Sequence, residues 1–198
     1  MAKEPYNPLD KLRLGESVAR ALLARPVVSL PPPESFIGAG IYALYYIGDF
    51  LAYQKIAERN ANDQWAAPIY VGEAVPPGAR KGGYGLGEAP GEALYRRLRQ
   101  HAESIQQVAN LSLEDFRCRF LVVDDIWIPL GESLLISMFS PLWNQVVDGF
   151  GIHNPGKNRP QQRSLWDEVH PGRPWAANLK PNSRSKDEIL KSITEFLE

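Results

Sequence analysis

The feature that most constrains this chain is a pair of short apolar segments, each bounded by glycine or proline. Residues 40–48 read Gly-Ile-Tyr-Ala-Leu-Tyr-Tyr-Ile-Gly, and residues 68–72 read Pro-Ile-Tyr-Val-Gly. β-Branched and aromatic residues favour strands, whereas glycine and proline interrupt them. We therefore predict two strands, of which the first is buried and the second ends at Gly72.

The remainder of the body alternates between helical and extended patterns. Apolar spacing predicts helices over residues 92–108 and 130–139, and a short helix between residues 49 and 60. Residues 116–123 have the composition of a third strand. Glycines and prolines fill residues 73–91, which predicts a mobile loop. The main elements thus follow the order strand, strand, helix, strand, helix.

Further elements are predicted at both ends of the chain. Apolar residues between positions 14 and 22 keep helical spacing, and Asn7-Pro8 has the pattern of a helix start. Three prolines at 31–33 predict a stiff extended connector. The stretch after Asn144 is rich in glycine and proline and is too long for a routine connection, so we expect it to be functional or mobile. Ser185 and Glu188 form a capping box that opens a last helix.

Composition limits the class of protein. A chain of 198 residues with 44% hydrophobic and 23% charged residues is typical of one elaborated soluble domain. Its single cysteine, Cys118, cannot form an intrachain disulfide, which fits a reducing compartment such as the cytoplasm. The apolar runs are too short for a signal core or a membrane span, so we expect neither an anchor nor export. The net charge of -1 gives no overall sign of an anionic partner.

Two polar residues interrupt an apolar helix face. Within the helix expected over residues 92–108, one face at helical spacing carries Leu94, Arg97, Leu98, His101 and Ile105. A buried arginine is costly unless it meets an anion. His101, taken alone, is compatible with an ordinary core histidine that has its hydrogen bonds satisfied.

The next helix carries a similar anomaly. Glu132 shares a face with Leu135, Ile136 and Phe139, which places a carboxylate at the head of an apolar stripe. A buried salt bridge between Arg97 and Glu132 is one explanation of both anomalies. A site that binds an anion and a cation is the other.

Two tyrosines lie on the two predicted strands. Because side chains alternate along a strand, Tyr42 and Tyr70 point away from their apolar neighbours. If the strands pair, both phenols can lie on one face of the sheet, although aromatic packing alone would also explain them. Phosphodiester hydrolysis requires such a set: a carboxylate that holds a hard cation such as Mg²⁺, and an arginine that offsets charge on the phosphate.

These residues resemble the GIY-YIG nuclease superfamily. The resemblance rests on Gly40-Ile41-Tyr42, a later Tyr-x-Gly, an arginine on one helix and a glutamate on another, across residues 38–144. Tyr46-Ile47-Gly48 spells the second half of the family name but lies on the same predicted strand as Tyr42. The family places the two halves on two strands of a hairpin. We therefore assign the second half to Tyr70-Val71-Gly72.

A longer pattern is similar to the branch of type II restriction endonucleases that cut CCGCGG. It includes the 29–33 segment Ser-Leu-Pro-Pro-Pro, the 141–151 segment Pro-Leu-Trp-Asn-Gln-Val-Val-Asp-Gly-Phe-Gly, and His170-Pro-Gly-Arg. Many relatives carry lysine after Tyr-x-Gly, where this chain has Glu73. Lys81 or another cation substitutes for it, or a lysine is dispensable, or activity is reduced.

The resemblance implies a role for each residue of the set. Glu132 would bind Mg²⁺, for which Mn²⁺ can substitute, and Arg97 would contact the scissile phosphate. Tyr42, Tyr70 and His101 would orient or deprotonate the attacking water, with Asn144 in support. An unperturbed tyrosine is a poor base near neutral pH because its pKa is about 10. The base therefore stays open at this point.

The resemblance also implies an α+β fold, with a small central antiparallel sheet flanked by helices. One nuclease domain would span residues 1–198, with an N-terminal arm (1–37), a catalytic core (38–144) with an enlarged hairpin insertion (48–68), and a C-terminal extension (145–198). A double-strand break at a palindrome calls for two centres and hence a homodimer, with contacts from the arm and the insertion. The alternatives are a nicking or repair nuclease without sequence preference and a non-catalytic DNA-binding module.

Basic and amide side chains in the glycine-rich stretches are candidates for contacts to double-stranded DNA. Arginine and lysine read guanine in the major groove, and some will contact only phosphate. Taken alone, each basic group is also compatible with an ordinary solvated surface. The candidate DNA-binding residues are Arg80, Lys81, Lys157, Arg159, Gln162 and Arg163.

Overall fold

The protein is built around a four-stranded antiparallel sheet covered by helices. The computed structural model describes residues 10–76, 89–153 and 161–198. The strands are β1 (Val28–Ser29), β2 (Gly40–Tyr46), β3 (Pro68–Ala74) and β4 (Phe116–Val122), in the spatial order β1-β4-β2-β3. β2 pairs with both β3 and β4, so the first predicted strand is central and fully buried, as expected. The α+β class with an antiparallel sheet is confirmed.

The prediction that Gly72 ends the second strand was wrong. β3 continues through Glu73 to Ala74, and Gly72 pairs with Tyr42 of β2. Gly72 is required there by contact, since a Cβ atom at this position would collide with the phenol of Tyr42. Glycine therefore marks a close approach inside the strand rather than its end. The two-residue strand β1 has no pattern that predicted it.

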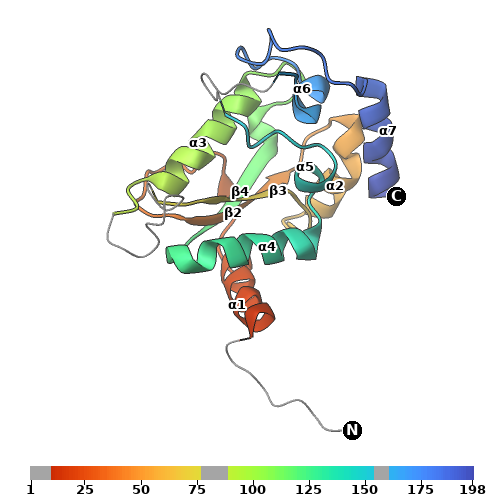
Figure 1. The fold of residues 1–198 in the computed structure, drawn as a ribbon. Helices are drawn as coiled ribbons and strands as arrows, with labels where there is room; N and C mark the ends of the chain where they lie inside the picture. The colour runs from red at the N-terminus through yellow and green to blue at the C-terminus, as the bar shows by residue number, and fades with distance from the viewer. Residues whose placement is uncertain (1–9, 77–88, 154–160) are drawn as a thin grey trace.

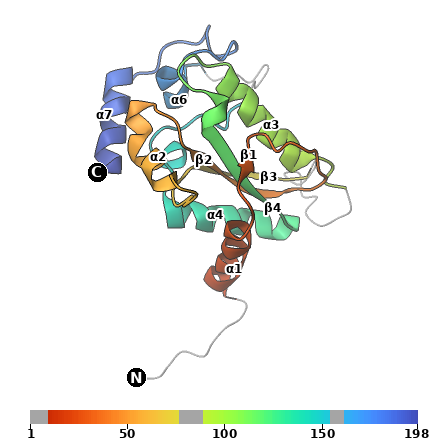
Figure 2. The ribbon, with the colours of Figure 1, turned by 180° about the vertical axis from the view of Figure 1, so that it is seen from behind.

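Two helical layers cover the sheet (Figure 1). α3 (Ala93–Gln106) lies on one face, and α1 (Lys11–Leu23) with α4 (Ile128–Phe139) lies on the other, as the rear view in Figure 2 also shows. The alternation of β2 explains both layers, because successive side chains enter opposite clusters. Tyr42, Leu44 and Tyr46 join the cluster of α3, while Ile41, Ala43 and Tyr45 join that of α1 and α4.

The predicted first helix is present, but its start differs. Asp10 caps α1, with its carboxylate accepting hydrogen bonds from the backbone N–H groups of Leu12 and Arg13. Asn7 and Pro8 lie outside the described residues. Gly15 is buried in this helix because Leu134 of α4 packs against it, at 3.1 Å from where a Cβ atom would be. The low helix propensity of glycine is thus offset by the close packing of α1 against α4 at this position.

The segment between β2 and β3 contains the expected short helix. A 3₁₀ turn, η1 (Leu51–Tyr53), leads into α2 (Gln54–Asn60). Asn60 is almost fully buried and closes the segment, because its amide donates to the carbonyls of Tyr46 and Ala67 and accepts from the Ala67 N–H. α4 begins at Ile128, two positions before the predicted start, after the turn η4 (Asp125–Trp127); another turn, η3 (Leu113–Asp115), precedes β4.

The described part of the region after α4 contains two short helices that the sequence did not predict. α5 (Leu142–Gln145) and α6 (Leu165–Val169) are short helices, and only the last helix, α7 (Lys186–Leu197), was predicted. Its capping box is confirmed. α7 lies beside α2 in both views, and Lys55 donates to the carbonyl of Leu197 (Figures 1 and 2). Within the described ranges, no helix is long and apolar enough to cross a membrane.

Candidate active site

A buried hydrogen bond joins the sheet to α3 at the centre of the molecule. The phenol oxygen of Tyr42 lies 2.5 Å from Nε2 of His101, and both side chains are almost completely buried. Tyr42 stands in the middle of β2, and His101 is one of the polar residues that interrupt the inward face of α3. The expectation that His101 points inward is confirmed, and its partner is a tyrosine of the set.

Tyr70 completes a group of three rings. In the register of β2 and β3, Tyr70 pairs with Leu44 and lies diagonally from Tyr42, on the same face of the sheet. Its ring centroid is 6.2 Å from that of Tyr42 and 5.4 Å from that of His101. The two phenols therefore share a face, as the alternation of strand side chains predicted.

Arg97 and Glu132 act on both phenols. Burial first, then the nearby Tyr70, raises the pKa of Tyr42 well above its usual value, while Arg97 lowers it and Glu132 raises it. Burial, followed by Glu132, raises the pKa of Tyr70 to about 12, against a lowering by Arg97. Charges on two different helices thus influence the pKa values of the same pair of tyrosines. Tyr42, Tyr70, Arg97, His101 and Glu132 are the candidate catalytic residues, and we call this candidate site the catalytic cluster.

His101 is held in its neutral form. Burial is the largest cause that lowers the pKa of His101 well below its usual value, followed by the neighbouring His153, Arg97 and Arg173. Nδ1 of His101 has no hydrogen bond partner among the described residues. A neutral imidazole retains one lone pair that accepts a proton.

Neither charged residue of the cluster is fully buried. Arg97 and Glu132 are both partly exposed, whereas Leu94, Leu98 and Leu135 on the same helix faces are buried. Solvent exposure allows an anion to approach Arg97 and a cation to approach Glu132 from outside. Because both side chains are partly exposed, a salt bridge between Arg97 and Glu132 would not be fully buried.

Asn144 supports the cluster through the backbone. Its side chain, on α5, accepts a hydrogen bond from the N–H of Val71 at 2.8 Å and donates to the carbonyl of Val71 at 2.9 Å. β3 is an edge strand of the sheet, so these bonds complete its outer edge immediately after Tyr70. Asn144 thus binds the backbone of the strand that carries Tyr70, and its supporting role in the reaction stays a prediction.

Three residues that sequence reasoning missed lie against the cluster. The ring of Phe150 stacks on His101, with centroids 4.5 Å apart and planes 18° apart, and it also packs on Tyr70. The ring of His153 lies 4.8 Å from that of His101. A Cβ atom at Gly151 would lie only 2.6 Å from the phenol oxygen of Tyr70. The available signal in the sequence was an aromatic residue between two glycines, with a histidine two positions after the second glycine.

His153 is a second neutral imidazole beside the cluster. Burial, followed by Arg97 and Arg173, lowers its pKa to about 4. Its Nδ1 lies 3.4 Å from the hydroxyl of Ser104 on α3. The region therefore presents two uncharged imidazoles, both influenced by Arg97 and Arg173.

Glu73 lies within β3, opposite Ile41 of the central strand. It is partly buried, and it is the smallest of the causes that raise the pKa of Tyr70. A lysine at this position would have the opposite electrostatic effect on Tyr70. The departure from the pattern of relatives thus falls next to the cluster.

Most of the predicted DNA contacts lie outside the described residues, namely Arg80, Lys81, Lys157 and Arg159. Gln162 is exposed and its backbone forms a bridge with Lys180. The guanidinium of Arg163 donates to the carbonyl of Ala177 and forms an ion pair of 3.8 Å with Glu168. DNA binding by these residues stays a prediction.

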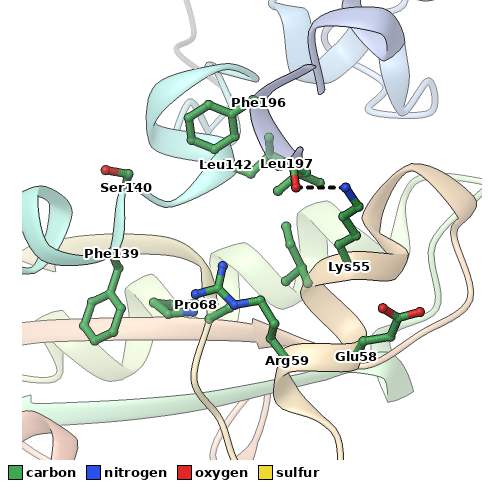
Figure 3. Close-up of a pocket in the computed structure, with 11 residues that line it drawn as sticks. Lys55, Glu58, Arg59, Pro68, Phe139, Ser140, Leu142, Phe196 and Leu197 are labelled. Atoms are coloured by element: carbon green, nitrogen blue, oxygen red, sulfur yellow. Dashed lines mark hydrogen bonds between the residues drawn. The ribbon is translucent and has the colours of Figure 1, made fainter. Parts of the chain in front are cut away.

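A cavity of about 580 Å³ lies apart from this cluster. Figure 3 shows it between α2, α7 and the link from α4 to α5, with Lys55, Arg59 and Phe196 around it. None of the residues that line it belongs to the catalytic cluster. The cluster is therefore not placed in this cavity.

A comparison with models of protein families identifies the family of the chain. Residues 34–197 match the family model described as the Eco29kI GIY-YIG domain. The chain belongs to this family. The match includes every residue of the catalytic cluster and begins after α1. A search of curated proteins found no match.

Family membership fixes the fold and the general activity. The four-stranded antiparallel sheet with its helices is the α+β fold of a GIY-YIG domain. The chain carries a restriction endonuclease domain and is a nuclease, a hydrolase of phosphodiester bonds in DNA. Eco29kI itself is a type II restriction enzyme that recognises CCGCGG.

Proposed function

We propose that this protein is a type II restriction endonuclease that cuts both strands of double-stranded DNA at a short palindrome, CCGCGG, as a Mg²⁺-dependent homodimer. The observation that carries the proposal is the catalytic cluster, in which Arg97 and Glu132 influence the same two phenols that pack around a neutral His101. The specificity is proposed from the family match, because Eco29kI recognises this sequence.

The donor set fits Mg²⁺. Among the described residues, no three histidine, cysteine or acidic side chains gather into a metal-binding group. Mg²⁺ commonly takes one or two carboxylates and completes its shell with water and phosphate oxygens. Glu132, partly exposed, would hold it in this way. The bound ion would polarise the scissile phosphate and offset charge on the leaving oxygen.

The chain's own residues would position the phosphate and the water. Arg97 pairs with the phosphate oxygens, and this contact offsets the charge that develops in the transition state. Tyr42 and Tyr70 stay protonated at neutral pH because burial raises both pKa values. They therefore orient the attacking water by hydrogen bonds rather than acting as phenolates.

His101 would be the final proton acceptor. As the water attacks phosphorus, its proton passes to the oxygen of Tyr42, and the phenol proton of Tyr42 passes to Nε2 of His101 along their shared hydrogen bond. Arg97 is one of the causes that lower the pKa of His101. A phosphate bound to Arg97 offsets that positive charge, and thereby makes His101 a better acceptor when DNA is present.

Two exposed apolar residues support a dimer. Leu12 on α1 and Leu51 on the insertion are 66% and 81% exposed. Large exposed apolar side chains are common at protein interfaces. They lie on the two segments that the family resemblance assigned to dimer contacts. We expect a two-fold axis that presents one catalytic cluster to each DNA strand.

One experiment separates the candidate functions. Plasmids with and without a single CCGCGG site would be incubated with the protein and Mg²⁺, and the ends would be mapped. Linear product from the first plasmid alone supports the proposal. Cleavage of both plasmids identifies a nuclease without sequence preference, and DNA binding without cleavage identifies a binding module.

Matched variants test the metal carboxylate. Glu132→Gln keeps the shape of the side chain and should bind CCGCGG DNA without cutting it. Glu195→Gln removes an exposed carboxylate on α7 and should cut like the unaltered protein. Full cleavage by Glu132→Gln would reject the proposed metal site. Light scattering should give the mass of two chains, and a monomer that still makes double-strand breaks would reject the dimer.

A further inference from the structure

The C-terminal extension contains a fully buried arginine whose hydrogen bonds are all satisfied. Arg173 is 1% exposed, and its guanidinium pairs with both carboxylate oxygens of Asp167 at 2.7 and 2.8 Å. It also donates to the carbonyls of Gly149, Phe150 and Ile152. These five bonds use all five N–H donors of the side chain. Arg173 is the end of the His170-Pro-Gly-Arg pattern, to which the proposed function gives no role.

The arginine itself is rigidly held. The rings of Trp166 and Trp175 lie 4.6 and 4.7 Å from its guanidinium carbon. Asp167, on α6, is 3% exposed and also accepts a hydrogen bond from the hydroxyl of Ser164. A planar guanidinium that packs against two indole rings and makes five hydrogen bonds has one orientation. Its three carbonyl partners are therefore fixed as well.

Those carbonyls belong to the segment that packs against the catalytic cluster. Phe150 stacks on His101, and Gly151 lies so close to the oxygen of Tyr70 that no side chain fits between them. The segment whose carbonyls bind Arg173 therefore also contacts two residues of the cluster, His101 and Tyr70. Gly149 contributes a φ of +97°, a conformation that glycine adopts without strain.

We propose that Arg173 is a positioning residue for DNA cleavage, which locks residues 149–152 so that Phe150 and Gly151 hold His101 and Tyr70 in place. The inference rests on the proposed function, because it assigns Arg173 an effect on the same cluster. Arg173 does not reach the substrate in this role. It acts through the backbone of the segment and through the ring of Phe150.

Arg173→Lys is the primary test. Lysine keeps the positive charge beside Asp167 but cannot make the planar set of five bonds. A small displacement of a catalytic group costs up to about 100-fold in rate, so we expect kcat to fall by at least about 10-fold. KM for CCGCGG DNA should change by no more than about 3-fold, since Arg97 and the DNA-contacting surface are unaltered.

Asn60→Ala is the matched control. Asn60 is also buried and also clamps backbone groups, through three hydrogen bonds to Tyr46 and Ala67. None of these bonds involves residues 149–152. The two variants would be compared at a temperature where both are folded by circular dichroism. A kcat for Arg173→Lys no lower than that of Asn60→Ala would overturn the proposal.

Phe150→Leu provides a second test that leaves the clamp in place. The carbonyl at position 150 is retained, but the aromatic face against His101 is lost. We expect a fall in kcat similar to that of Arg173→Lys. Unchanged kcat in Phe150→Leu would overturn the proposal even if Arg173→Lys failed to fold.

A spectroscopic readout separates this inference from the proposed function. The chain has three histidines, so their imidazole NMR signals can be assigned with single His→Gln variants. Arg173→Lys should shift the His101 signals, and Asn60→Ala should leave them in place. An inactive unaltered protein that still showed this difference would reject the proposed function, but it would still show that Arg173 positions His101. Unshifted His101 signals in Arg173→Lys would reject the positioning role alone.

Discussion

The phenol oxygen of Tyr42 and Nε2 of His101 are 2.5 Å apart in the interior of the protein, although 59 positions separate the two residues in the chain. This hydrogen bond joins the central strand to α3. In the proposed mechanism, it is the path by which a proton leaves the attacking water. Its position explains why His101 is one of the two polar residues on a mainly apolar helix face.

The two candidate tyrosines of the family motif can be separated by substitution. The hydroxyl of Tyr46 accepts a hydrogen bond from the N–H of Phe50 at 2.8 Å, and its ring packs on Tyr53 and Phe116. Tyr46→Phe should therefore reduce the unfolding free energy by about 1 kcal/mol and leave cleavage nearly unchanged. Tyr70→Phe should reduce the cleavage rate by about 100-fold or more. Steady-state cleavage of a CCGCGG plasmid measures both, and the reverse ranking would show that Tyr46 belongs to the site.

Asn144→Ala should loosen the edge strand. It removes two hydrogen bonds and leaves both backbone groups of Val71 without this partner, at a cost of about 1–3 kcal/mol in unfolding free energy. Cleavage should fall because Tyr70 precedes Val71. Amide hydrogen exchange at Val71 is the direct measurement. Unchanged protection of that amide would contradict the assigned role.

Asn144→Asp distinguishes the two bonds of this side chain. The carboxylate can still accept from the N–H of Val71 but presents an oxygen to its carbonyl. We expect a loss of stability at least as large as in Asn144→Ala near neutral pH, measured by urea unfolding. A stability equal to that of the unaltered protein would show that the bond to the carbonyl contributes little.

Glu73 is predicted to make Tyr70 a weaker acid. Burial and Glu132 are the larger causes of the raised pKa of Tyr70, and Glu73 adds to them. Glu73→Gln should lower the pKa of Tyr70, and Glu73→Lys should lower it further, because a negative charge is first removed and then replaced by a positive one. Tyrosine-selective NMR titration measures the shift. Glu58→Gln, at an exposed position on α2, is the control and should have no effect. A rise in the pKa would contradict the prediction.

Buried neutral histidines should make stability depend on pH. Burial, followed by Lys186 and Arg173, lowers the pKa of His170 to about 3 in the folded protein, and its imidazole bonds Tyr53 and Asn110. In the unfolded chain, histidine has a pKa of about 6.5. Between these values the unfolded state binds a proton that the folded state does not, so stability is present above about pH 6.5 and is lost as the pH falls.

The slope of the unfolding free energy against pH shows which histidine causes the loss of stability. Each such histidine should reduce the unfolding free energy by roughly 1.4 kcal/mol per pH unit below about pH 6. Urea unfolding between pH 4.5 and 7.5, within that window, measures the slope. His170→Gln should reduce the slope by one proton's contribution, and His153→Gln should act similarly down to about pH 4, where His153 itself titrates. Identical slopes in all three proteins would contradict the pKa directions.

Much of the fold and of the catalytic cluster was accessible from local patterns. Strand alternation placed Tyr42 and Tyr70 on one face, and helical periodicity directed His101 inward, because both follow from the geometry of a single element. The same local rule misread Gly72, since glycine at a strand position signals either an end or a close approach. Only the contact with Tyr42 decided between them.

The sequence by itself determined the order of the main elements, the class of chemistry and the identity of the clustered residues. The tertiary structure decided what holds them: that Asn144 binds the backbone of Val71, that Phe150 covers His101, and that Arg173 fixes the segment between them. These contacts join residues far apart in the chain. They depend on how separate helices, strands and loops pack together, and the periodic pattern within one segment carries no information about that packing.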